Sequence, residues 1–124
     1  MREKARAFFD EAKLLCAAKK YDGAASRLYY ALYHAVIVGF DENGIKQSSL
    51  TKKMDHARTD YWLHEVVRGF ASFAGVSRRN TWIIETAWRQ RVIADYNPET
   101  VDEAKVSQLM IEAKGIFSDV GISI

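Results

Sequence analysis

Three polar side chains recur at helical spacing in an apolar stretch early in the chain, "SRLYYALYHAV" at 26–36. At about 100° per residue, Arg27, Tyr30 and His34 fall on one stripe of a helix. Arginine can donate to phosphate oxygens, and histidine has an ordinary pKa that suits a general base. The same pattern also fits plain packing, with tyrosine hydroxyls at the rim of a core and a half-buried, hydrogen-bonded histidine. The residues alone leave both interpretations open.

A second polar group follows in "WRQRVIADYNP" at 88–98. Arg91 and Asp95 share a helical stripe, and Tyr96 comes next, where Pro98 must end the helix. A carboxylate beside an arginine can orient the guanidinium for phosphate oxygens. The alternative is an ordinary surface pair, worth roughly a few tenths of a kcal/mol.

Apolar residues at spacings of three and four predict the helices that would position these groups. The expected helices cover 3–18, 24–38, 59–73, a fourth from a Ser77 cap to Asn97, and a last one from Thr100. Gly39 and the Asn43-Gly44 turn signal should end the second helix, and Thr100 with Glu103 forms a capping-box pattern. No stretch alternates as a strand does, so we expect an all-α, antiparallel, up-and-down bundle of four or five helices.

Composition narrows the class of protein. The 124 residues suit one domain, 1–124, with 18 basic and 16 acidic side chains giving a net charge of +2. No run approaches the roughly 18 apolar residues of a membrane span. The single cysteine, Cys16, cannot form an intrachain disulfide, and we expect a cytoplasmic protein. The spacing of His56, His64 and Cys16 supports no metal site, and no Gly-rich phosphate loop occurs, so no cofactor is expected.

The two motifs together carry a family resemblance. The early pattern "YDGAASRLYYALYHA" and the later "RVIADY", in a chain of this size, resemble the HEPN family (higher eukaryotes and prokaryotes nucleotide-binding domains), and more closely its small stand-alone prokaryotic members. The match runs from Ala5 to Phe117. The resemblance implies a helical bundle that forms a homodimer and, in many members, a partner protein that is a minimal nucleotidyltransferase.

The best-known activity of that family is metal-independent RNA cleavage, by an arginine followed after four to six residues by a histidine. Arg91 matches the arginine, and Tyr96 occupies the position of the partner. Since tyrosine is a poor base at neutral pH, His34 is the candidate base, with Arg91 stabilising the phosphorane. Arg27, Tyr30 and Tyr96 would then hold the substrate, and Asp95 would orient Arg91.

Two functions remain open at this point. One is a toxin-like ribonuclease of a toxin–antitoxin pair. The other is a non-catalytic module that binds a nucleotide or contacts a minimal nucleotidyltransferase, with no bond broken. The catalytic hypothesis requires Arg27, His34 and Arg91 to converge on one solvent-filled pocket.

Overall fold

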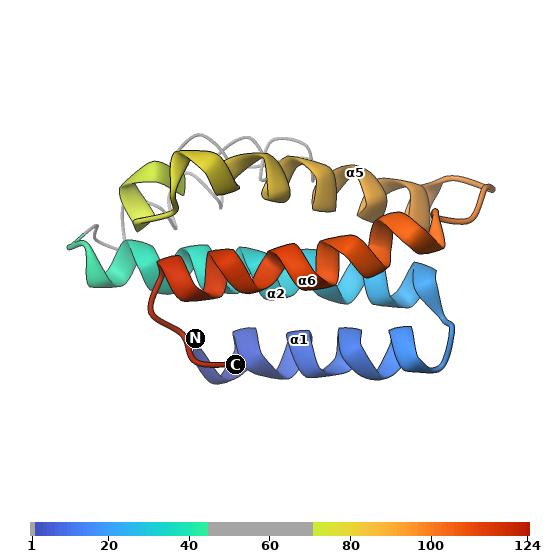
Figure 1. Cartoon of the computed structure of the whole chain (residues 1–124), viewed down its shortest axis with the longest axis horizontal. Helices are drawn as coiled ribbons and strands as arrows, with labels where there is room; N and C mark the ends of the chain where they lie inside the picture. The colour runs from blue at the N-terminus through green and yellow to red at the C-terminus, as the bar shows by residue number, and fades with distance from the viewer. Residues whose placement is uncertain (1, 45–70) are drawn as a thin grey trace.

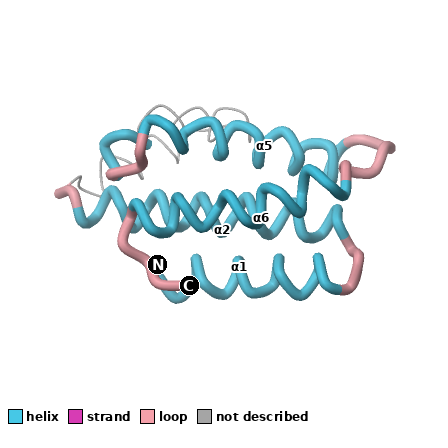
Figure 2. Tube along the Cα trace, in the orientation of Figure 1, coloured by secondary structure: helices cyan, strands magenta, loops and turns pink. Residues whose placement is uncertain are grey.

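The computed structural model describes residues 2–44 and 71–124, without the side chains of residues 72 and 73. The described helices are α1 (Arg2–Ala17), α2 (Tyr21–Glu42), α5 (Thr81–Tyr96) and α6 (Glu103–Asp119), with two 3-10 turns, η1 (Ala71–Ala74) and η2 (Arg78–Asn80). Neither described range contains a strand, so the predicted all-α class is confirmed (Figure 2). Most of the expected helix 59–73 lies outside the described residues.

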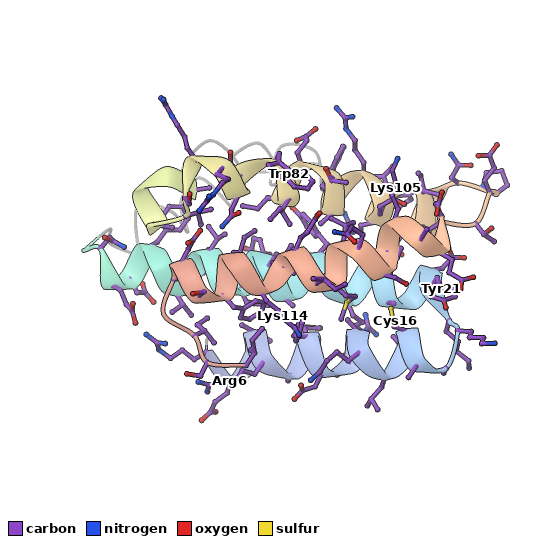
Figure 3. All side chains as sticks on the ribbon, in the orientation of Figure 1. Arg6, Cys16, Tyr21, Trp82, Lys105 and Lys114 are labelled. Atoms are coloured by element: carbon purple, nitrogen blue, oxygen red, sulfur yellow. The ribbon has the colours of Figure 1, made fainter. Side chains whose placement is uncertain are left out.

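The helices form a bundle around α2. It contacts α1, α5, α6 and η1, while α5 also packs against α6. Consecutive described helices run in opposite directions along a common axis, as predicted (Figure 1). The chain ends lie close together. Arg2 donates to the Gly121 carbonyl (2.8 Å) and Arg6 to that of Ser123 (2.9 Å), which holds the last residues against the start of α1 (Figure 3).

The core draws on every helix. Phe9 of α1 packs its ring 5.2 Å from that of Phe117 in α6, and Leu32 of α2 is fully buried. One large aromatic side chain of α5 lies largely outside this core, since Trp82 is 49% exposed. Among residues 2–44 and 71–124, no helix combines the length and hydrophobicity needed to cross a bilayer.

The second helix is longer at both ends than its apolar pattern predicts. It starts at Tyr21, two residues after Lys19, which takes a left-handed conformation (φ 59°) in the turn from α1. Gly39 does not end it but lies inside, where a Cβ would overlap the carbonyl oxygen of Ala74. The glycine therefore serves close packing of η1, and the helix ends at the predicted turn, where the Asn43 amide donates to the Gly39 carbonyl (2.8 Å).

Two predicted caps are wrong. No side-chain capping bond is made by Ser77, whose backbone N–H donates to Asp119 (2.8 Å) in front of η2. The N-cap of α6 is Asp102, which accepts from the Lys105 N–H (3.2 Å), and Thr100 lies outside the helix. Aspartate is as good an N-cap as threonine, so the sequence offered two competing start signals. The end of α5 at Tyr96, before Asn97-Pro98, is confirmed.

Candidate functional site

Arg91 is the centre of the site. It lies on the face of α5 that meets α2, and only 5% of it is exposed. Its Nη2 donates to the Tyr30 hydroxyl at 3.0 Å, and its Nε lies 3.2 Å from Oδ2 of Asp95. A charge this deeply buried requires compensation, because desolvation disfavours an ionised group. Asp95 compensates from the same helix and Tyr30 from α2.

Three tyrosine rings surround the guanidinium of Arg91. Its Cζ lies 5.3 Å from the ring centroid of Tyr30, 5.6 Å from that of Tyr96 and 5.7 Å from that of Tyr29. These distances fall in the range of cation–π attraction. Sequence reasoning gave Tyr29 no role at the site, although its place on the neighbouring stripe of α2 was a usable signal. We refer to Arg91, Asp95, Tyr29, Tyr30 and Tyr96 as the arginine cluster.

Asp95 links the arginine cluster to a further residue of α2. Its Oδ2 accepts a hydrogen bond from the hydroxyl of Ser26 at 3.4 Å, while the same oxygen faces Arg91. The carboxylate side chain is 32% exposed, whereas Ser26 is 9% exposed. The carboxylate thus lies between a buried cation and a buried hydroxyl, at the edge of the solvent.

The end of α5 explains why the cluster opens toward solvent on one side. The helix stops at Tyr96 because Asn97, in extended conformation (ψ 140°), precedes Pro98. Tyr96 is 65% exposed, in contrast to the buried Tyr29. The aromatic rings around Arg91 therefore range from core to surface.

His34 lies in different surroundings. Its ring stacks on Phe8 of α1 (centroids 5.3 Å apart, planes at 5°) and meets the ring of Tyr33 edge-on at 5.1 Å. It is 9% exposed, and its Nδ1 has no hydrogen-bond partner within the described part of the molecule. Burial, together with the charge of Lys4, lowers the pKa of His34 to about 4, so the imidazole is neutral at pH 7.

Arg27 points to another surface. Its Nε lies 2.9 Å from Oε2 of Glu11, and both side chains are about half exposed. The structure thus joins Arg91, Tyr30, Asp95 and Tyr96 in one cluster, and joins Arg27 to α1 instead. The predicted convergence of Arg27, His34 and Arg91 on one solvent-filled pocket is therefore wrong, because each of the three contacts a different partner, Glu11, Phe8 and Tyr30 respectively. Phe8 of α1 contacts both the arginine cluster and His34, because its ring is 5.8 Å from that of Tyr30 and stacks on His34.

Two hollows of the described part lie away from the arginine cluster. One hollow of about 440 Å³ lies at the α1–α2 turn, lined by residues that include Lys19, Lys20 and Thr100. Within it, Tyr21 donates to Glu103 (3.0 Å), and the Val101 N–H donates to Asp22 (3.0 Å). Over residues 2–44 and 71–124, no three His, Cys, Asp or Glu side chains are grouped to hold a metal ion.

No family model, curated protein or solved structure matches this chain.

Proposed function

We propose that this chain is a HEPN-type protein that handles RNA or a nucleotide, with Arg91 as the group that meets phosphate. One observation carries the proposal. The two motifs behind the family resemblance lie far apart in the sequence, yet they meet at one guanidinium, since Arg91 of the second motif donates to Tyr30 of the first. Residues 61 positions apart thus form a single polar site inside a helical bundle.

The chemistry of the cluster suits an anionic ligand. Arginine is always charged and offers planar N–H donors that match phosphate oxygens. Asp95 and Tyr30 hold the guanidinium in one orientation, which lowers the entropy lost when a ligand binds. Tyr96 adds an exposed phenol whose ring centroid lies 5.6 Å from Cζ of Arg91. Its hydroxyl can donate a hydrogen bond to the same ligand.

In its catalytic form, this function is metal-independent cleavage of RNA. A base takes the 2′-hydroxyl proton, the 2′ oxygen attacks phosphorus, the bond from phosphorus to the 5′ oxygen breaks, and that oxygen takes a proton. The products are a 2′,3′-cyclic phosphate and a 5′-hydroxyl. Arg91 would stabilise the charge of the phosphorane. His34 is the candidate base, although its ring stacks on Phe8 and burial lowers its pKa to about 4, which makes it a weak base at pH 7.

The surroundings of His34 favour a second candidate, a non-catalytic module. Its ring is enclosed by Phe8 and Tyr33, and it makes its ring contacts with them rather than with Arg91. In this second function the arginine cluster binds a nucleotide phosphate or a minimal nucleotidyltransferase without breaking a bond. For both functions we propose a cytoplasmic homodimer, and light scattering on the purified chain tests whether it is a dimer.

An assay on purified protein separates the two functions. Labelled single-stranded RNA is incubated in buffer with a chelator, and ATP and GMP are titrated calorimetrically. The test variant is Arg91→Lys, which keeps the charge but loses the planar fork. The matched control is Arg89→Lys on the same helix, where the side chain is 70% exposed.

Cleavage by the wild type and by the Arg89 variant, lost in the Arg91 variant, supports the ribonuclease. Nucleotide binding with the same dependence on Arg91 but no cleavage supports the module. If the wild type neither cleaves RNA nor binds a nucleotide, or if the Arg91 variant matches the wild type, the proposed function is wrong.

A further inference from the structure

Ser26 is a buried polar residue with an unexpected partner. A serine inside a helix commonly bonds back to a carbonyl of its own preceding turn. The hydroxyl of Ser26 instead crosses from α2 to α5 and donates to Oδ2 of Asp95 at 3.4 Å. That same oxygen lies 3.2 Å from Nε of Arg91. The three groups form a chain of contacts that ends at the guanidinium.

We propose that Ser26 is a positioning residue, which fixes the Arg91 guanidinium by holding the Asp95 carboxylate from the neighbouring helix. The inference rests on the proposed function, because it assigns how the phosphate-binding group is oriented. Asp95 belongs to the last turn of α5, and about a third of its side chain is exposed. A carboxylate in such a position can rotate, and a donor on a second helix restricts that rotation.

Tyr30 restrains the other end of the same group. It accepts from Nη2 of Arg91 at 3.0 Å, so this hydroxyl serves the arginine. Ser26 and Tyr30 lie one turn apart on α2 and thus act on the two ends of one guanidinium. Two residues of α2 thus contribute to the orientation of Arg91, although Arg91 belongs to α5.

The packing around Ser26 makes its hydroxyl separately testable. The two residues before it, Ala24 and Ala25, are both buried, and Ser26 itself is 9% exposed. An alanine at position 26 would keep the helix and nearly the same volume. Ser26→Ala therefore removes the hydrogen bond and little else.

The experiment observes the guanidinium of Arg91 directly, by NMR of the ¹⁵N-labelled full-length protein. The Arg91 Nε–Hε signal is assigned by its loss in Arg91→Lys. In Ser26→Ala we expect that signal to shift and its proton to exchange with water about three- to tenfold faster, because a weaker restraint lets the ion pair open more often. Tyr30→Phe should perturb the same signal, and Ser107→Ala, an exposed serine of α6, should not.

Binding supplies the second readout. We expect Ser26→Ala to weaken ATP binding about three- to tenfold, the range of one modest hydrogen bond. A thermal melt checks that the variant is folded. An Arg91 signal unchanged in Ser26→Ala overturns the positioning role, whatever the protein binds. A shifted signal in a protein that binds neither ATP nor RNA supports the positioning of Arg91 and overturns the proposed function instead.

Discussion

The arginine cluster and the His34 site share helix α2, but only the first gives its buried polar group polar partners. Tyr30 and His34 share one stripe of α2 and differ by a single turn. At the first, a buried cation has a carboxylate, a phenol and three aromatic rings around it. At the second, an imidazole stacks on one ring and meets another edge-on, and its Nδ1 makes no hydrogen bond within the described ranges.

The difference follows from protonation. Arginine cannot give up its proton in a protein, so it can be buried only where acceptors come with it. Histidine can lose its charge, so a ring pocket holds it as a neutral group, at the cost of a lowered pKa. Polar residues one turn apart therefore need not belong to one site.

Removal of the buried cation should have the largest effect on stability. We expect Arg91→Met to lower the free energy of unfolding by about 2–4 kcal/mol, because it breaks a largely buried ion pair and its aromatic contacts. Urea unfolding at neutral pH measures the loss. Arg89→Met is the control, since its pair with Glu85 is exposed and should contribute less than about 1 kcal/mol. Equal losses in the two variants would show that the arginine cluster gives no special stabilisation.

Acid should act on the other site. The folded-state pKa of His34, about 4, is below its ordinary value of 6.5, so the unfolded chain binds a proton first as the pH falls. The neutral imidazole therefore contributes full stability above pH 6.5 and loses it progressively down to pH 4, by roughly 3 kcal/mol in total. His34→Phe should keep the stack on Phe8 and flatten this part of the pH profile.

Unfolding of both proteins between pH 4 and pH 7 tests that expectation. The difference between wild type and variant isolates His34, because every other titrating group is common to both. A difference that stays constant across the range would contradict the buried neutral imidazole.

The sequence predicted the bundle well, because apolar spacing reports which face of a helix is covered. It predicted the end of α5 at Pro98, which is a local rule. It failed where a distant contact decides. The sequence predicted that Gly39 would end the second helix, whereas in the structure it lies inside α2 and allows η1 to pack closely. It predicted Thr100 as the N-cap of the last helix, whereas the N-cap is Asp102.

The candidate site was predicted in part for the same reason. The pairing of Arg91 with Asp95 follows from helical spacing, and their meeting with Tyr30 was expected only from the family resemblance. Spacing could not reveal that Arg27, on the same stripe as Tyr30, turns toward α1. Its partner, Glu11, lies on another helix, and such pairs depend on how the helices are rotated against each other.

The smallest effect is expected at Arg27. A variant at this position tests whether the binding surface extends beyond the arginine cluster. Its pair with Glu11 is about half exposed, so water and salt already screen both charges. Arg27→Ala should lower the free energy of unfolding in urea by less than about 1 kcal/mol, and a double-mutant cycle with Glu11→Ala should give a coupling energy that falls with added salt.

ATP titration of Arg27→Ala then tests whether the surface around Arg27 belongs to the same binding site as the arginine cluster. An affinity equal to that of the wild type confines the site to the residues that touch Arg91. A tenfold loss would instead extend the binding surface across α2 to α1, since no contact described between Arg27 and the arginine cluster could transmit it.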